Sequence, residues 1–473
     1  MQRRTMLLSA AVMAALGSAS PLALAADQTM NVDVCIVGAG AGGVSAGMAS
    51  VDAGFKTVIL EKLGVIGGGG NYMEGTFAVG SRLQLKDNVG INVEKQFKRV
   101  MDFHHWRING KALNNWLKQT AATIDWMEQH GIKFEGVHTA FIDGNRTWHM
   151  FEGGHGSSLI KNFAQKIEAK GGQILTSTPA QSLIIDKNGT VTGVIAKNED
   201  GDKITINAKA VIIATGGAGR MHYQGFPTSN HYGATADGLV LGYRAGAKLL
   251  YADTLQYHPT GAAYPEQIFG ALVTEKVRSL GAKLVNVDGE VFMNPLETRD
   301  VTASTVIREC RRGKQVNTPT GGQGVWLDSP MIDLIHGEGT IEKRIPAMLR
   351  MFLKYGIDIR KQPMLIYPTL HYQNGGVKVG TDSQTCVENL FVAGEAAGGV
   401  HGENRLMGNS LLDVIVFGRN AGKYAAAKAK TVEVGNLTLD HVAKFEKELA
   451  DAGIQPDEVS PKLLPDYTRK VNN

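Results

Sequence analysis

Cysteine is scarce in this chain of 473 residues, and its spacing excludes several kinds of site. The three cysteines, Cys35, Cys310 and Cys386, are far apart, so they match neither a zinc site nor the Cys-x-x-Cys-His sequence that attaches a c-type haem. We interpret all three as small buried hydrophobic residues. The sequence therefore predicts no metal site and no haem attached to this chain.

A strong charge of either sign is also missing. The formal net charge is +4, and no basic run is interleaved with aromatic residues. Proteins that bind nucleic acid usually concentrate basic residues on one face or along one helix. We therefore predict that nucleic acid is not a partner.

Long hydrophobic runs are absent except for a short one near the N-terminus. Residues 1–26 combine a charged start at Arg3 and Arg4, an apolar stretch over residues 6–16 and small residues at 23–25. This pattern is typical of a signal peptide, and it is too short for a membrane anchor once cleaved. The paired arginines followed by Thr-Met-Leu resemble a twin-arginine signal, with a plain Sec signal as the alternative. We expect a periplasmic or secreted protein that is not an integral membrane protein.

Glycine, by contrast, is abundant. The chain has 58 glycines, about twice the average share, without the three-residue period of collagen. They cluster at residues 38–43, 67–70, 216–219 and 394–402. Such clusters are typical of loops that hold a nucleotide.

The first cluster has the context of a dinucleotide-binding motif. The sequence predicts a buried strand over residues 32–37, the turn GAGAGG at 38–43, a helix over 44–53 and a second strand over 55–60 that ends at Glu61. The glycines admit a pyrophosphate to the N-terminus of the helix, and the acid accepts hydrogen bonds from a ribose. This part of the chain is therefore predicted to be Rossmann-like.

Further along, the pattern changes twice. Residues 94–130 and 157–169 read as helical, with Trp106, Trp116 and Trp126 packed in the core. Short strands follow around Leu175 and over residues 183–186, 191–197 and 203–207, with Asn-Gly and Asp-Gly turns at 188–189 and 200–201. Another buried strand over 210–213 then returns to a glycine turn. From 251 to 371 no nucleotide loop appears, and a helix is expected over 341–355.

These patterns predict an α/β fold with two domains. A Rossmann-like nucleotide-binding domain with an antiparallel β excursion would occupy residues 27–252 and 372–473. An inserted α+β second domain would occupy residues 253–371.

The segment at residues 391–410, FVAGEAAGGVHGENRLMGNS, is the most informative in the chain. A short strand enters a glycine-rich turn in which Gly394, Gly398 and Gly399 allow the backbone to approach a planar ligand. His401 and Arg405 lie in the turn and suit a carboxylate. A helix that begins near residue 410 directs its positive N-terminal end to the same place.

With these motifs in order, the chain resembles the flavoprotein family of fumarate reductases and succinate dehydrogenases. The resemblance covers nearly all of the chain after the predicted signal peptide. Within the family, the chain is similar in type to the soluble, exported branch without a haem domain, such as periplasmic fumarate and urocanate reductases. It rests on GAGAGG at 38–43, ATGGAG at 214–219, ATADG at 234–238, QYHPT at 256–260, TEKVR at 274–278, TRD at 298–300, HYQNGG at 371–376 and the segment at 391–410.

The resemblance implies FAD as the cofactor, with the Rossmann-like domain as the FAD-binding domain and the inserted α+β domain as a capping domain over the substrate. Residues 69–77, where membrane-bound relatives carry a flavin-linking histidine, contain none, so we expect noncovalent FAD. Without a haem, a separate redox partner such as a c-type cytochrome or a quinol-linked protein would supply electrons. The residues expected to bind FAD are Gly38, Ala39, Gly40, Gly43, Glu61, Lys62, Gly70, Asn71, Thr215, Gly216, Asp237, Glu395, Arg405, Ser410, Leu411 and Leu412.

The resemblance also implies the reaction, which is reduction of the C=C bond of a 2-enoic acid by hydride from flavin N5. Fumarate, giving succinate, is the first candidate substrate. By this resemblance His258, His371 and Arg405 hold the substrate carboxylates. Fixed cations there stabilise the charge that develops in the transition state.

The proton donor of the family corresponds to Arg299. An arginine is a weak acid, so its proton must be replaced at once, and Glu275 and Arg278 match the relay that does this. Their spacing of three residues places them on one face of a helix. Taken alone, the pair would equally suit a surface ion pair.

Three departures from the family leave the substrate open. Asn374, Glu403 and Met407 stand where relatives usually have methionine, a small residue and glycine, and the loop at 259–272 looks longer. A reductase of urocanate, acrylate or an aryl enoate is therefore the alternative. A non-catalytic FAD electron carrier is a further rival. The export signal argues against an aspartate oxidase, and the lack of a C-terminal helical domain argues weakly against succinate oxidation.

Overall fold

The computed structural model describes residues 28–139, 145–221, 225–402, 404–406, 408–433 and 438–454. The predicted signal peptide, Glu403 and Met407 lie outside these residues. Among the described residues, no helix combines the length and apolar character needed to cross a bilayer.

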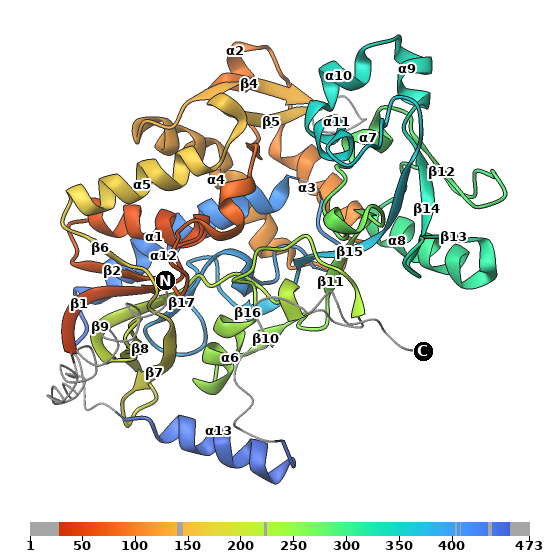
Figure 1. Ribbon diagram of the computed structural model, residues 1–473. Helices are drawn as coiled ribbons and strands as arrows, with labels where there is room; N and C mark the ends of the chain where they lie inside the picture. Colours follow the sequence, from red (N-terminus) through yellow and green to blue (C-terminus); the bar gives the residue numbers. More distant parts are fainter. Residues whose placement is uncertain are drawn as a thin grey trace, which may run out of the picture.

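The main sheet has parallel strands at its centre and an antiparallel arm at one end (Figure 1). Its order is β6-β2-β1-β9-β8-β7, and β17 also pairs with β9. The strands are β1 Gln28–Val37, β2 Thr57–Leu60, β6 Gln173–Leu175, β7 Ala180–Ile185, β8 Val191–Lys197, β9 Lys203–Ile213 and β17 Leu390–Val392. This is the predicted Rossmann-like sheet with its antiparallel excursion.

Strand β9 joins what the sequence suggested were two strands. Its first half pairs with β8 in antiparallel fashion, and its last three residues pair with β17 in parallel, so both neighbours lie along one edge of β9. The predicted hairpin turns lie before and after β8, with Gly189 and Gly201 at positive φ of 82° and 86°. The excursion is therefore an extension of the main sheet rather than a separate layer.

The carboxyl ends of three parallel strands meet at one edge of this sheet. Val37 of β1 pairs with Ile213 of β9, which pairs with Val392 of β17. The three glycine-rich turns that follow these strands therefore lie together, although they are far apart in the sequence. Ligands of open α/β sheets bind at this edge.

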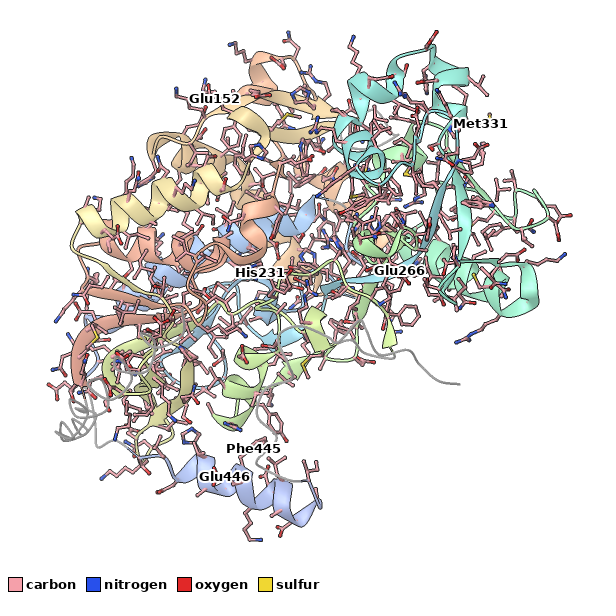
Figure 2. The ribbon with its side chains drawn as sticks, in the orientation of Figure 1. Glu152, His231, Glu266, Met331, Phe445 and Glu446 are labelled. Atoms are coloured by element: carbon pink, nitrogen blue, oxygen red, sulfur yellow. The ribbon has the colours of Figure 1, made fainter. Side chains whose placement is uncertain are left out.

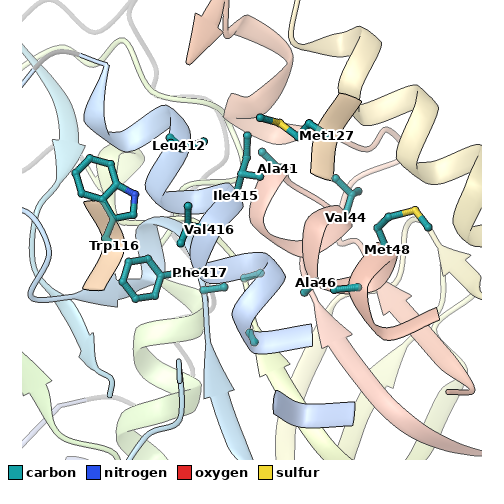
Figure 3. Close-up of a cluster of buried hydrophobic side chains, with 14 of the residues drawn as sticks. Ala41, Val44, Ala46, Met48, Trp116, Met127, Leu412, Ile415, Val416 and Phe417 are labelled. Carbon is teal, nitrogen blue, oxygen red and sulfur yellow. The ribbon is translucent and has the colours of Figure 1, made fainter. Parts of the chain in front are cut away.

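Helices α1 (Ala41–Asp52) and α12 (Asn409–Ala429) pack against each other and against the main sheet. Figure 3 shows Val44 and Met48 of α1 on the side of Ile415 of α12, and Trp116 of α4 (Gly110–Gln129) on the side of Phe417, all in one hydrophobic cluster. Glycines allow the backbones to touch. A Cβ at Gly418 would lie 2.3 Å from the Gly42 oxygen, and one at Gly422 would lie 2.1 Å from the Ala46 oxygen.

A second sheet with its own hydrophobic core forms the cap, at the right of Figure 1. Its order is β11-β15-β14-β12, with β13 paired to β14. The strands are β11 Leu255–Ala262, β12 Lys283–Val285, β13 Val316–Asn317, β14 Gln323–Asp328 and β15 Met364–Gln373. The helices are α7 Lys276–Ser279, α8 Arg299–Glu309, α9 Met331–His336, α10 Thr340–Arg344 and α11 Pro346–Leu353, with a π-helical turn at Cys310–Lys314. The predicted domain boundaries stay predictions, and β15 runs across one of them.

The remaining elements complete the part of the molecule around the main sheet and the cap. They are α2 Arg82–Lys86, α3 Val93–Phe103, α5 Ser157–Ala169, α6 Asp237–Arg244, α13 Asp440–Asp451, β3 Gly75–Phe77, β4 Phe134–Thr139, β5 Arg146–Phe151, β10 Leu249–Leu250, β16 Gly376–Lys378, β18 Ala397–Gly398 and the short turns Gly68–Tyr72, Glu152–Gly154, Gly219–Met221, Glu266–Ile268 and Gly394–Ala396. In Figure 2, Phe445 of α13 lies on the side of α6, where the Arg244 guanidinium is 4.5 Å from the centre of its ring.

Three sequence predictions are wrong. The helix expected over 341–355 is broken into α10 and α11, because Pro346 has no N–H to continue it and Ile345 before it has non-helical φ and ψ of −137° and 47°. Trp106 is 61% exposed, in a turn at positive φ, although Trp116 and Trp126 are buried as expected. Cys386 is exposed, whereas Cys35 and Cys310 are buried.

Replacing Gly422 by alanine should destabilise the protein. Alanine favours a helix by roughly 1 kcal/mol over glycine, but its Cβ would meet the Ala46 backbone at 2.1 Å. Overpacking of this kind costs about 1–3 kcal/mol, so calorimetry should show a lower Tm. The control is Lys423→Ala, at the next and exposed position, which should change stability by no more than about 0.5 kcal/mol. A Gly422→Ala protein as stable as the parent would contradict the proposed backbone contact.

Candidate active site

A cavity of about 2970 Å³ lies between the carboxyl edge of the main sheet and the cap. Figure 2 labels His231 and Glu266, which line it from the two sides. Small-molecule sites are usually 300–1,000 Å³, so this cavity has room for a large cofactor and a substrate. Most of the residues predicted to bind cofactor line it, namely Gly38, Gly40, Glu61, Lys62, Gly70, Thr215, Gly216, Asp237, Glu395, Arg405, Ser410 and Leu411.

Four of the predicted cofactor residues do not line the cavity. Gly43 lies beneath the first turn, where a Cβ would come within 1.9 Å of the Gly38 oxygen. Asn71 donates from its side chain to the Ile66 carbonyl at 2.9 Å. Ala39 and Leu412 are fully buried among core residues. Contact of these four with a cofactor stays a prediction.

One end of the cavity is built from β1, α1 and β2. Helix α1 begins at Ala41, and the residue before it, Gly40, has no side chain to cap it. N–H groups of the first turn are therefore left for a ligand in the cavity. At the end of β2, Glu61 accepts hydrogen bonds from the backbone N–H groups of Ala39 (2.9 Å) and Leu63 (3.0 Å). Lys62 forms an ion pair with Asp237 across the same end.

At the cap end, a row of charged side chains runs from the cavity into the interior. Arg299 donates from Nε to Glu275 Oε2 (2.9 Å) and from Nη1 to Gln256 Oε1 (2.9 Å). Arg278 lies behind, with Nη2 3.6 Å from Glu275 Oε1 and only 1% of its surface exposed. Burial favours a raised pKa for Glu275, but Arg299 and Arg278 outweigh it and lower the pKa. The surface ion-pair interpretation is therefore wrong for Glu275 and Arg278.

Two histidines lie next to each other in the cavity wall, with His258 buried and His371 half-buried. The rings of His258 and His371 are 5.2 Å apart, in an edge-to-face arrangement. Burial, with the charge of Arg299 next for His258 and that of Arg405 next for His371, lowers both pKa values well below the usual range. Both rings are therefore neutral at pH 7.

Hydrogen bonds orient the two rings. The backbone N–H of Thr260 donates to His258 Nδ1 (3.3 Å), which leaves the ring proton on Nε2. His371 Nδ1 lies 2.8 Å from Ser229 Oγ. Each ring thus keeps Nε2 available for a ligand in the cavity.

Arg405 is held at the junction between the main sheet and the cap. Its Nη1 donates to Ser410 Oγ (2.6 Å), and its guanidinium lies 4.5 Å from the centre of the Tyr372 ring. Burial lowers the pKa of Arg405 to about 10, so the group stays charged at pH 7. In the described part of the chain, its buried Nε has no hydrogen-bond partner. This nitrogen is left for an anion.

Glu395 lies in the turn after β17, where it is half-buried. Oε1 accepts hydrogen bonds from the Gln373 N–H (2.8 Å) and the Asn230 side chain (3.2 Å). Burial outweighs these bonds and raises the pKa of Glu395 to about 7. A carboxyl group at this position is therefore partly protonated near neutral pH.

The sequence analysis missed three side chains that hold the site in place: Gln256, Ser229 and Tyr372. Gln256 also donates to the Arg405 carbonyl (2.8 Å), so it joins the two arginines across the lobes. Its position two residues before His258 on one strand was a usable signal. Ser229 and Tyr372 reach the site only through tertiary contacts. Asn374, by contrast, is buried but does not line the cavity.

Comparison with known proteins adds the family. The FAD binding domain family matches residues 33–411. The chain belongs to this family. It is 33% identical over 444 residues to an uncharacterized FAD-dependent oxidoreductase of Methanocaldococcus jannaschii, covering 89% of this chain and 77% of that protein. It is 30% identical over 455 residues to the fumarate reductase flavoprotein subunit of Haemophilus influenzae, covering 88% and 72%.

A solved structure agrees with these relatives. The quinol fumarate reductase of E. coli superimposes with a TM-score of 0.75 at 27% identity, covering 90% of this chain and 75% of that one. The chain spans between 50% and 77% of the length of the first curated relatives. The family match and these relatives together make the chain an FAD-dependent oxidoreductase of the fumarate reductase and succinate dehydrogenase flavoprotein family.

The cavity fits the FAD that the family binds. The uncapped N-terminus of α1 suits a pyrophosphate, and Glu61 beside it suits a ribose. The N-terminus of α12, at Ser410 and Leu411, also lines the cavity and offers a positive dipole end. Bound FAD would leave the cap end, with Arg299, Arg405 and the two histidines, for a substrate.

Glu395 should make the FAD-free protein less stable as the pH rises. Its pKa is about 7 when folded against an ordinary value of 4.5, so the unfolded chain loses this proton first. The stability that it contributes is present below about pH 4.5 and is lost by about pH 7, a change of about 3 kcal/mol. Glu395→Gln should remove this part of the pH dependence in calorimetry from pH 4.5 to 8. Glu168→Gln, at an exposed position on α5, should leave it unchanged. An unaltered pH profile in Glu395→Gln would refute the raised pKa.

Proposed function

We propose that this protein is an FAD-dependent reductase of the C=C bond of a 2-enoic acid, with fumarate, reduced to succinate, as the first candidate substrate. The observation that carries the proposal is the gathering of Arg299, Arg405, His258 and His371 in one cavity, at the carboxyl edge of an FAD-binding sheet. The relatives named as fumarate reductases support the same chemistry.

The residues of the cavity suit a bound carboxylate. Arg405 offers its unpartnered Nε and a full positive charge, and the neutral His258 offers an N–H at Nε2. His371 lies opposite, held by Ser229. Because these groups are fixed before substrate binds, they stabilise the charge that builds on the carboxylate in the transition state.

Reduction adds a hydride to one alkene carbon and a proton to the other. Bound FAD supplies the hydride. Arg299 is the proton donor in this proposal, because it lines the cavity and its Nη2 has no hydrogen-bond partner among the described residues. After that transfer, Glu275, on Nε of the same guanidinium, takes up a proton that originates from solvent and arrives by way of Arg278, and it passes this proton to Arg299. Glu275 is then a carboxylate again, the form that Arg299 and Arg278 favour between turnovers.

The cap end also supports the alternative, a bulkier enoate such as urocanate or an aryl acid. The loop at 259–272 contributes Ala263, Ile268, Phe269 and Leu272 to the cavity wall. Phe269 and Leu272 are 41% and 36% exposed, so their apolar surface is available to a larger ligand. Fumarate itself has no apolar group that would contact them.

Three further features belong to the proposal. FAD is held without a covalent bond, since residues 69–77 contain no histidine. A separate redox partner, such as a c-type cytochrome or a quinol-linked protein, reduces the flavin, because the chain has no haem-attachment sequence. The protein is exported to the periplasm or beyond, for which the N-terminal sequence is the support. A non-catalytic electron carrier would give no reason for Arg299, Glu275 and Arg278 to occur together.

An anaerobic assay with reduced viologen over a panel of enoates tests the reaction. Fumarate should oxidise the viologen, and the saturated acid of each pair should not. A preference for an aryl acid or urocanate over fumarate would select the alternative substrate. If no enoate is turned over, the reductase proposal is wrong.

Replacement of Arg299 by alanine tests the proton donor. Turnover should fall by about 10²- to 10⁴-fold, the usual contribution of an acid or base, while the visible spectrum shows that FAD is retained. Arg350→Ala, at an exposed position on α11, is the matched control and should keep parental turnover. An Arg299→Ala enzyme with unchanged turnover would remove Arg299 from this role.

A further inference from the structure

A second, smaller cavity of about 460 Å³ lies outside the candidate active site. We call it the outer pocket. It is lined by the aromatic residues Phe226 and Tyr257 and by the exposed arginines Arg308, Arg311 and Arg312, with Ser304 and Ile307 completing it. Its volume is within the range of small-molecule sites.

The outer pocket lies on the back of the active-site wall. On β11, His258 lines the main cavity, whereas its neighbour Tyr257 lines the outer pocket, as expected for alternating side chains. On α8, Arg308 follows Arg299 by about two and a half turns, which places it on the opposite face. Phe226 lines both cavities. The two sites therefore share a wall that is one strand and one helix thick.

The positive charge of the outer pocket is not neutralised by the protein. None of the three arginines has an ion pair in the described part of the chain. The acids nearest in sequence are engaged elsewhere, since Asp300 lies 3.0 Å from His105 Nε2 and Glu309 accepts a hydrogen bond from the Asn286 side chain (3.0 Å). Three guanidinium groups without an ion pair, one in the last turn of α8 and two in the π-helical turn after it, attract an oxyanion.

The floor of the pocket is aromatic. The Phe226 and Tyr257 rings are 4.7 Å apart and tilted by 60°, and the Tyr367 ring stacks on Phe226 at 5.9 Å. Tilted rings make a wedge that contacts a flat apolar body, while a bare inorganic anion gains nothing from them. Charge and floor together favour a ligand with an oxyanion head and a planar apolar body.

We propose that the outer pocket is a second binding site, which takes a small aryl carboxylate with its carboxylate on Arg308, Arg311 and Arg312 and its ring on Phe226 and Tyr257. Binding at this site does not require turnover, so it stands or falls independently of the proposed reductase activity.

Titration calorimetry of the full chain carrying FAD tests the site, with trans-cinnamate as the probe. Cinnamate should bind, and the neutral cinnamyl alcohol and inorganic phosphate should each bind at least about tenfold more weakly, since one lacks the charge and the other the ring. Phosphate binding as tight as cinnamate would show that the rings contribute nothing, which would overturn the proposal. Binding of cinnamyl alcohol as tight as that of cinnamate would show that the arginines contribute nothing, which would also overturn the proposal.

Variants locate the site. The triple variant Arg308→Gln, Arg311→Gln, Arg312→Gln should weaken cinnamate binding at least about tenfold, with the parental Tm and FAD content. Arg350→Gln, an exposed arginine of the same lobe, should bind as the parent does. Arg405→Gln should keep binding in the outer pocket. Binding that is lost in Arg405→Gln and kept in the triple variant would assign cinnamate to the active site and refute the outer pocket.

A crystal soaked with 4-bromocinnamate gives a reading that does not depend on any variant. The anomalous signal of bromine should lie between α8 and β11, beside Tyr257. A signal found only beside Arg405 would overturn the proposal.

Discussion

The cavity depends on direct backbone contact between α1 and α12. Gly42, Gly418 and Gly422 bring the two helices closer than side chains would permit. Because both helices begin at the cavity, this contact also fixes their N-termini side by side, with Gly40 and Ala41 from one and Ser410 and Leu411 from the other in the wall. Two positive dipole ends are thus directed at one volume. The three parallel strand ends, which pair in register beneath them, supply the glycine turns that let a cofactor approach.

Charge at the cap end is balanced in a way that favours an anionic ligand. Arg299 and Arg278 share one carboxylate, Glu275, so their buried group keeps a positive charge. Arg405 contacts a hydroxyl and a ring, and no carboxylate of the described residues is within ion-pair distance of it. Burying such charges without partners is costly. The histidines avoid this cost by staying neutral, whereas the arginines of the resting site keep their charge. In the proposed reaction, a substrate carboxylate would supply the missing partner.

Much of this site could be predicted from the sequence, because its parts lie in local motifs. The GAGAGG turn, the acid after β2 and the pair Glu275 and Arg278 each need only a short stretch of chain to be recognised. Side chains that join distant segments could not be found in this way. Ser229 reaches His371 across 142 residues, and Gln256 reaches the Arg405 carbonyl across 149.

The wrong predictions have a similar physical origin. Trp106 is apolar and follows a helical pattern, yet it falls in a turn after α3 that directs it to solvent. The two strands expected around residue 208 are one, since the same edge of β9 serves β8 first and β17 next. Pro346 was visible in the sequence, but the apolar pattern on both sides of it suggested one helix. In each case the local pattern was real, and its continuation was decided by distant neighbours.

The wall of the cap has one face in the main cavity and the other in the outer pocket. Strand β11 contributes His258 to the main cavity and Tyr257 to the outer pocket, and α8 contributes Arg299 to the first and Arg308 to the second. A residue on the outer face is therefore connected to the main cavity through the backbone of one strand or one helix. The Gln256 side chain on β11 accepts a hydrogen bond from Arg299 and donates one to the Arg405 carbonyl. A shift of β11 would therefore change the spacing between Arg299 and Arg405. In the proposed reaction, this spacing would set where the proton donor Arg299 lies relative to a carboxylate held by Arg405, so the position of the cap strand would matter as much as the FAD-binding sheet.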